Sequence, residues 1–279
     1  MRTYLDCYPC FLRQALDGAR HAGADNEGQQ RVVSHVLGLL KRAEPSRTPP
    51  EIGDEVHRMV RRICGNGDPY RGAKDASTRQ ALALFPQLKV LVQEALDPLD
   101  VALRLSIAGN IIDLGPDHQY DLWGVIERVL SQSFALDDRA ALRQALDQAD
   151  EVLYLADNAG ETVFDRILIE ALDVPVTYAV KGGPVLNDAT LADARAAGLD
   201  GAATLVDTGS DAPGTILHRC SSAFRALYDQ AELIVAKGQA NYETLSEAGP
   251  KAFLLLQTKC PVIARDAGVP EGSIVVKQG

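Results

Sequence analysis

The strongest constraint in this sequence is a change in the spacing of its apolar residues near Glu151. Before this point apolar residues recur at intervals of three and four, as in the stretch 50–65, which is typical of amphipathic helices. After it, they gather in runs too short for helices, with amphipathic helical patterns between most of them. These runs lie at 152–156, 176–180, 203–206, 233–236, 253–256 and 274–276.

The short runs predict the class of fold. Uninterrupted apolar strands that alternate with helices are typical of a mostly parallel sheet covered by helices on both faces. We therefore predict an α/β fold with a Rossmann-like, doubly wound sheet, preceded by an all-helical N-terminal subdomain. The predicted boundary gives a helical subdomain at 1–148 and an α/β domain at 149–279.

Charge and composition exclude several classes of partner. The 28 Lys and Arg residues and 38 Asp and Glu residues give a net charge of −10, which repels nucleic acid and anionic membranes. No stretch approaches the roughly 20 apolar residues that a spanning helix needs, and no apolar signal core follows the first residues. Five scattered cysteines do not form a disulfide framework. We expect a cytoplasmic protein with reduced thiols, and any phosphate-binding site must be local.

Polar residues and glycine follow four of the predicted strands. Asp157, Asn158 and Gly160 follow the first, Lys181 and Gly182 the second, Asp207 and Gly209 the third, and Lys237 and Gly238 the fourth. In an open α/β sheet, ligands bind beyond the carboxyl ends of the strands. We therefore expect these residues to meet at one edge of the sheet.

Asp157, Asn158 and Asp188 form a candidate metal site. Carboxylate and amide oxygens are the ligands that Mg²⁺ and Mn²⁺ prefer, and three such ligands leave positions for water and a phosphate oxygen. The competing interpretation is structural. Asp157 and Asn158 could form a turn and cap a helix, and Asn187 or Asp188 could cap a helix that begins near residue 189.

Lys181 and Lys237 are candidates for neutralising a bound phosphate. Backbone N–H groups of Gly238 and of the loop 209–214 would add donors, and Asn187 is a further candidate for substrate binding. Hydrolysis of a phosphomonoester depends on such charge neutralisation and positioning. A single lysine after a strand is more often a solvated charge, so the hypothesis rests on four strand ends together.

Cys7 and Cys10 form a CxxC motif at the start of a predicted helix. The helix dipole would lower a thiol pKa at this position. Five scattered histidines and the lack of a second CxxC leave a zinc knuckle unsupported. Structural packing, a metal role and a redox role all stay open for this pair.

Several motifs together resemble one known family. They are Asp-Asn-Ala-Gly-Glu at 157–161, Lys-Gly-Gly-Pro-Val-Leu-Asn-Asp-Ala-Thr at 181–190, Lys-Gly-Gln-Ala-Asn-Tyr-Glu at 237–243, Ser-Ile-Ala-Gly-Asn at 106–110 and the CxxC. In this order they resemble the damage-control phosphatases, in the prokaryotic branch that carries the CxxC. The matches extend over essentially the whole chain.

This resemblance implies a metal-dependent phosphatase acting on a small phosphorylated metabolite, such as a sugar phosphate or another phosphomonoester. It implies that Mg²⁺, Mn²⁺, Co²⁺ or Ni²⁺ is bound by Asp157, Asn158 and Asp188. It also implies that Lys237 contacts phosphate and that Asn110 and Glu161 lie near the site. The segment 68–70 with Lys74 resembles a family element that brings the helical part over the substrate.

Two other functions stay open. The same cation could serve a non-catalytic protein that only binds a phosphometabolite. Relatives have also been proposed to methylate protein carboxylates with S-adenosylmethionine, but Asp157 and Asn158 stand where a glycine-rich cofactor loop would be needed. Motifs for an aspartyl-phosphate, P-loop or cysteine-nucleophile mechanism are absent, so an activated water is the simplest nucleophile. Whether Glu161 acts as a base stays open.

Overall fold

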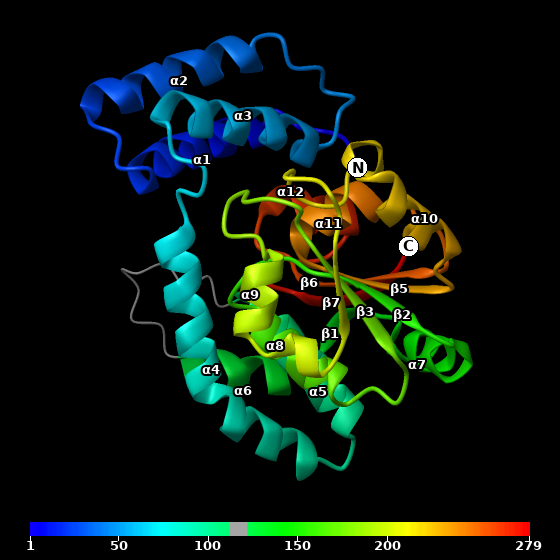
Figure 1. The fold of residues 1–279 in the computed structure, drawn as a ribbon. Coiled ribbons are helices and arrows are strands. Elements are labelled where there is room, and N and C mark those ends of the chain that lie inside the picture. The colour runs from blue at the N-terminus through cyan, green and yellow to red at the C-terminus, as the bar shows by residue number, and fades with distance from the viewer. Residues whose placement is uncertain (112–121) are drawn as a thin grey trace.

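A computed structural model of the chain describes residues 1–111 and 122–279. The part of the predicted helical subdomain at 112–121, which includes His118, lies outside these residues. In the described part, a seven-stranded sheet is covered by helices on both faces, and the first three helices form a separate layer beside it (Figure 1). None of the helices in these two ranges is long and apolar enough to cross a membrane.

The first three helices form a small bundle with its own apolar core. They are α1 (Cys7–His21), α2 (Asn26–Leu40) and α3 (Pro49–Cys64). Phe11, Val36 and Ile52 are among the buried residues where these helices meet. Helix α3 begins with a capping box, in which Thr48 and Glu51 satisfy each other's backbone N–H groups, followed by proline in the first turn.

His57 lies inside this bundle, on α3, with 3% of its surface exposed. Burial, together with the positive charge of Arg61, lowers the pKa of His57 from 6.5 to about 3. Between these two values the unfolded chain binds a proton that the folded chain does not. The free energy of unfolding should therefore decrease as the pH falls below 6.5.

We expect a His57→Asn variant to lose less stability than the wild type between about pH 7.5 and about pH 5. Over this interval, protonation of His57 in the unfolded chain should cost the wild type about 2 kcal/mol, at about 1.4 kcal/mol per pH unit. Urea unfolding of both proteins at both pH values measures this difference. Because asparagine does not titrate, the comparison isolates the contribution of His57. The same pH dependence in both proteins would contradict a buried neutral His57.

The sheet has the strand order β1-β7-β6-β5-β2-β3-β4. Its strands are β1 (Phe134–Asp137), β2 (Val152–Leu155), β3 (Val176–Val180), β4 (Thr204–Asp207), β5 (Leu233–Lys237), β6 (Ala252–Gln257) and β7 (Ile274–Gln278). Strands β2 to β6 pair in parallel, whereas β7 runs antiparallel to β6 and carries β1 parallel to itself. The sheet is therefore mostly parallel, as predicted.

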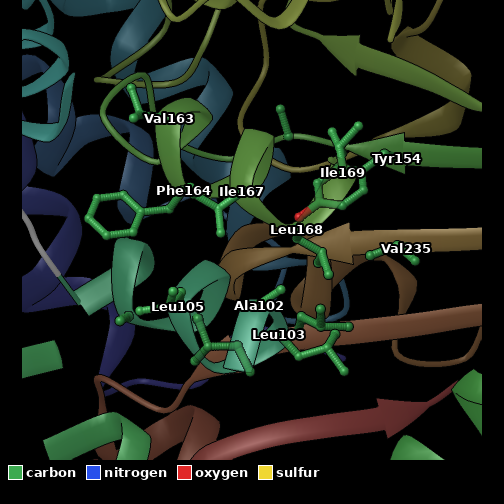
Figure 2. Packing of buried hydrophobic residues seen from close by; sticks show 14 of the residues in the cluster. Ala102, Leu103, Leu105, Tyr154, Val163, Phe164, Ile167, Leu168, Ile169 and Val235 are labelled. Atoms are coloured by element: carbon green, nitrogen blue, oxygen red, sulfur yellow. The ribbon is translucent and has the colours of Figure 1, made fainter. Parts of the chain in front are cut away.

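Alternate residues of the central strands face two different helical layers. Tyr154 and Val235 face the layer of α4 (Arg71–Gln93), α5 (Pro98–Ile111) and α8 (Thr162–Ile169), where Figure 2 shows them with Ile169 and Leu168. The opposite layer contains α10 (Ser222–Gln230), α11 (Gly238–Leu245) and α12 (Pro261–Ala267). The remaining elements are α6 (Leu122–Ser131), α7 (Arg139–Gln148), α9 (Leu191–Ala196) and the 3₁₀ turns η1 (Leu199–Gly201) and η2 (Leu217–Arg219).

The predicted fold class is confirmed, and the six predicted strands lie within two residues of the observed ones. The prediction that residues 1–148 are helical throughout is wrong at β1, which pairs with β7 at the edge of the sheet. Its four residues alternate between partly buried and exposed positions, so no apolar run marks them. Helix α5 also packs on α8, so the sheet and its cover begin before the predicted boundary.

Candidate functional site

The candidate site lies where the direction of the sheet connections reverses. Strands β2 and β5 are neighbours, but β2 leads to β3 on one side and β5 leads to β6 on the other. Such a switch point leaves a crevice beyond the carboxyl ends of the two strands. Asp157 follows β2, and Gly238 follows β5 at the start of α11. The strand order therefore brings the ends of β2 and β5 together, as predicted.

Asp157 packs directly against the backbone of Gly238. Gly238 has a φ of +80°, and a Cβ atom at this position would lie 1.8 Å from Asp157 Oδ2. Only glycine allows this approach. Asp157 Oδ2 accepts hydrogen bonds from Asn110 Nδ2 at 3.0 Å and from Asn158 Nδ2 at 3.3 Å. Glycine and the two amides thus hold a buried carboxylate in one position.

Glu161 fixes the orientation of the two amides. Glu161 Oε1 accepts a hydrogen bond from Asn158 Nδ2 at 2.7 Å and another from Asn110 Nδ2 at 2.8 Å. An asparagine amide has donors at one end and an acceptor at the other, so binding of Nδ2 by Glu161 turns the carbonyl Oδ1 of Asn158 to the opposite side. This oxygen is the group that a cation would require.

Asp188 is brought beside Asn158 by the backbone. The two residues form an antiparallel bridge, and Ala189 donates its backbone N–H to the carbonyl of Asp157 at 2.8 Å. Asp188 is buried, and its Oδ2 has no hydrogen-bond partner within the described part of the chain. Lys181 Nζ lies 3.5 Å from that oxygen. A buried carboxylate oxygen with no hydrogen-bond donor indicates that a ligand belongs there.

The structural interpretation of these residues as helix caps is wrong. Helix α9 begins later than predicted, at Leu191, and its capping box is formed by Thr190 and Asp193. Helix α8 begins at Thr162 after Glu161, and no side chain caps it. The side chains of Asp157, Asn158 and Asp188 are therefore not used by a helix terminus.

Burial and mutual repulsion perturb both carboxylates. Burial is the largest cause that raises the pKa of Asp157 well above its usual value, followed by the charges of Glu161 and Asp188. Burial also raises the pKa of Asp188 to about 6, although Lys181 opposes this shift. Crowded buried carboxylates disfavour their own ionised forms, and a bound cation would offset that cost. Such perturbation is typical of functional sites.

Lys181 is buried at the end of β3 and is not the solvated charge of the competing interpretation. Its ammonium donates to the carbonyl of Gly214 and forms an ion pair with Asp188 at 3.5 Å. Gly182 packs on Gly209, where a Cβ atom would lie 2.7 Å from backbone. The predicted phosphate loop 209–214 is therefore next to Lys181.

Lys237 is fully buried and surrounded by protein oxygens. Its Nζ lies 2.9 Å from the carbonyl of Ser106, 3.3 Å from Glu161 Oε2 and 2.7 Å from Asp165 Oδ1. Burial lowers the pKa of Lys237, but Asp165 and Glu161 more than offset this effect and raise it. The phosphate contact predicted for Lys237 would require the ammonium to give up one of these three partners.

The residue that sequence analysis missed is Asp165. It lies on α8 with no exposed surface and accepts hydrogen bonds from Tyr154, Tyr178 and Ser106 in addition to Lys237. The sequence did contain a signal for it. Asp165 stands among the apolar residues of the stretch 163–169, where a buried aspartate is unusual and needs polar partners.

The helical part of the chain covers one side of this site. Lys74 of α4 is buried and forms ion pairs with Asp68 at 3.3 Å and Asp193 at 3.2 Å. Ser77 packs on Gly160, where a Cβ atom would lie 2.9 Å from its hydroxyl. Asn187 accepts a hydrogen bond from the backbone N–H of Ala159 through its carbonyl at 2.8 Å. These contacts bring the nine predicted site residues together beyond the carboxyl ends of β2, β3 and β5.

Cys7 and Cys10 lie outside this crevice, at the start of α1, and both are free thiols. The pKa of both thiols is raised, by burial of Cys7 and by partial desolvation of Cys10, which is itself exposed, so the predicted lowering by the helix dipole is wrong. Within residues 1–111 and 122–279, no group of three or more His, Cys, Asp or Glu side chains is placed to hold a metal ion. The predicted metal site, Asp157, Asn158 and Asp188, is not a group of this kind, because one of its three ligands is an asparagine amide.

Known proteins resemble the chain over its whole length. The family model described as the damage-control phosphatase ARMT1-like domain matches residues 3–275. A damage-control phosphatase of Pyrococcus horikoshii is 33% identical, covering 99% of this chain and 97% of its own. An uncharacterised protein of Methanocaldococcus jannaschii is 34% identical, covering 97% of this chain and 93% of its own.

A solved structure agrees with these matches. The crystal structure of a DUF89 family protein from Pyrococcus horikoshii superimposes with a TM-score of 0.91 at 31% identity, covering 100% of this chain and 99% of the other. A second relative named damage-control phosphatase, from Archaeoglobus fulgidus, is 33% identical, covering 97% of each chain. These names support a phosphatase-type function. The chain belongs to the damage-control phosphatase family.

Proposed function

We propose that this protein is a divalent-metal-dependent phosphatase that hydrolyses a small phosphorylated metabolite, such as a sugar phosphate or a related phosphomonoester. The observation that carries the proposal is the convergence of Asp157, Asn158 and Asp188 at the switch point of the sheet, with one buried oxygen of Asp188 lacking a hydrogen-bond donor among the described residues. Family membership supports the same class of reaction.

The donor set fits a hard divalent cation. Two carboxylates and an amide carbonyl offer only oxygen atoms, which suit Mg²⁺ or Mn²⁺, and Co²⁺ or Ni²⁺ could replace them. Asp157, Asn158 and Asp188 would hold the ion. A bound cation supplies Lewis acidity that polarises the phosphoryl group and lowers the pKa of a water molecule. Glu161 holds the nitrogen end of the Asn158 amide, which would leave its carbonyl oxygen for the ion.

The charged groups around the cation position have separate roles. Lys181, which pairs with Asp188, would neutralise a phosphate oxygen, and the first turn of α11 would add backbone donors and the positive end of its dipole. These groups neutralise charge that develops on the phosphoryl oxygens. Lys74 pairs with Asp68 and Asp193 and lies on the helical side of the crevice, where the rest of the substrate would bind.

Glu161 is better suited to orient groups than to abstract a proton. Its Oε1 accepts two amide N–H groups, and its Oε2 faces the ammonium of Lys237. A carboxylate held in this way has its charge satisfied by protein donors. We therefore assign Glu161 to positioning Asn158 and Asn110, not to general base catalysis.

Metal removal is the direct test. After dialysis against EDTA, the protein should show no release of p-nitrophenol from p-nitrophenyl phosphate above the buffer background, and added Mn²⁺ should restore it. A phosphate-release assay over a panel of phosphorylated metabolites would then identify the preferred substrate. Full activity after complete chelation would refute the metal dependence. Metal-dependent binding of these compounds without phosphate release would instead support a non-catalytic binding protein.

A further inference from the structure

A buried carboxylate behind the site has no role in the reaction proposed above. Asp165 Oδ1 lies 2.7 Å from Lys237 Nζ and accepts hydrogen bonds from Tyr154 at 2.8 Å and Ser106 at 3.0 Å. Asp165 Oδ2 accepts a hydrogen bond from Tyr178 at 2.8 Å. The pKa values of both tyrosines are raised well above 10, chiefly by burial and then by the charge of Asp165. Both phenols therefore stay protonated and act as donors.

This cluster reaches the site through Lys237. The ammonium that Asp165 holds also faces Glu161 Oε2 at 3.3 Å. The other oxygen of Glu161 accepts the amide N–H groups of Asn158 and Asn110. A continuous set of charged hydrogen bonds thus connects Asp165 to Asn158, although the two side chains do not touch each other.

The connection matters because two buried carboxylate oxygens hold the nitrogen end of the Asn158 amide, and the contact to Glu161 Oε1, at 2.7 Å, is shorter than the one to Asp157 Oδ2, at 3.3 Å. Glu161 has two freely rotating carboxylate oxygens, and Asn158 has two nearly isosteric ends. Lys237 binds Oε2 and so presents Oε1 to the amide. The ammonium of Lys237 is carried by a long flexible side chain. Asp165 is the closest acidic partner of this ammonium, at 2.7 Å, compared with 3.3 Å for Glu161.

We propose that Asp165 is a positioning residue of the site: it anchors Lys237, so that Glu161 holds the Asn158 carbonyl toward the cation. This inference rests on the proposed metal-dependent function. Outer groups that orient metal ligands typically contribute a factor of about 10 to 100 in metal affinity or activity. A purely structural role for the cluster would affect folding stability alone.

The test compares Asp165→Asn with Tyr178→Phe. The first variant removes the charge that holds Lys237, whereas the second removes one hydrogen bond from the far oxygen of Asp165 and leaves Lys237 in place. Calorimetric titration with Mn²⁺ alone gives metal affinity, and urea unfolding gives stability. We expect Asp165→Asn to bind Mn²⁺ about 10 to 100 times more weakly. Tyr178→Phe should lower the urea midpoint but keep an affinity within about twofold of the wild type.

A variant with both Asp165→Asn and Lys237→Met is the control in case the single variant Asp165→Asn does not fold. Removing one partner of a buried ion pair is strongly destabilising. The double variant removes both partners of the Asp165–Lys237 pair and leaves Glu161, with its two amide donors, as the remaining buried charge. The double variant should fold and show the same weakened Mn²⁺ binding, because Glu161 again lacks its anchor. If Asp165 acts through Lys237, the two substitutions should not add in their effects on metal affinity.

The outcomes separate this inference from the proposed function. Wild-type Mn²⁺ affinity in Asp165→Asn or in the double variant would overturn the positioning role and leave the metal-dependent function intact. Equal weakening by Tyr178→Phe would also overturn it, because general loosening of the core would then explain the effect. Failure of the wild-type chain to bind Mn²⁺ would overturn both the proposed function and the role of Asp165.

Discussion

The Asp157→Asn variant is expected to lose phosphatase activity by roughly 10³-fold or more, since a metal ion contributes several kcal/mol and about 1.4 kcal/mol is a factor of ten. The substitution removes one of the two carboxylates that would hold the cation and keeps the shape of the side chain. Initial rates with p-nitrophenyl phosphate at several Mn²⁺ concentrations measure the loss. Excess Mn²⁺ should restore little of it, because an amide is a poor substitute for a charged ligand.

The same substitution should not destabilise the metal-free protein. Burial and the charges of Glu161 and Asp188 already disfavour the ionised form of Asp157, so a neutral amide relieves that repulsion. Asp137→Asn is the matched control, because Asp137 also ends a strand of this sheet but pairs with Arg139 at an exposed edge. Its activity should equal that of the wild type. Equal activity of Asp157→Asn and wild type would refute the proposed site.

The Gly238→Ala variant should lose activity by at least about 100-fold, because its new Cβ atom would collide with the carboxylate of Asp157. The clash cannot be relieved by rotation of the alanine, since the Cβ atom would lie 1.8 Å from Oδ2 and 2.3 Å from Cγ. The carboxylate must therefore move away from the position where Asn110 and Asn158 hold it. Mn²⁺ affinity should weaken together with activity.

Gly249→Ala separates the clash from backbone strain. Gly249 also has a positive φ, of +84°, but nothing lies within 4 Å of the position of its Cβ atom. Both variants carry the cost of about 1 to 2 kcal/mol for an L-residue in a left-handed conformation. Only Gly238→Ala displaces a site residue. Comparable loss of activity in both variants would show that strain, and not contact with Asp157, is responsible.

Local patterns were enough to locate the edge of the sheet where the site lies. Each predicted strand is an apolar run whose last residue is followed by a polar one, and the carboxyl ends of parallel strands meet at one edge. This reasoning placed Asp157, Lys181 and Gly238 at the same edge of the sheet, where the structure has them. The resemblance to the family added Asn110, which lies 47 residues from Asp157 in sequence and gave no signal of its own.

The site residue whose surroundings differed most from expectation is Lys237. A lysine at a strand end was expected to face phosphate, but its ammonium reaches Ser106, 131 residues away, and Asp165, 72 residues away. Strand β1 was missed for a related reason. Its alternating pattern is too short to be distinguished from the helices around it, and it becomes a strand through pairing with β7.

The sequence alone determined which segments become strands, which chemical groups follow them, and that oxygen ligands and lysines would share one edge of the sheet. These properties depend on spacing along the chain, which is local. Only the tertiary structure decided which charges neutralise each other: Lys237 is paired with Asp165, and Lys181 lies 3.5 Å from an Asp188 oxygen that has no hydrogen-bond donor in the described residues. Charge pairing depends on the direction of side chains from distant segments inside a low-dielectric core, and that direction exists only after the helices pack on the sheet.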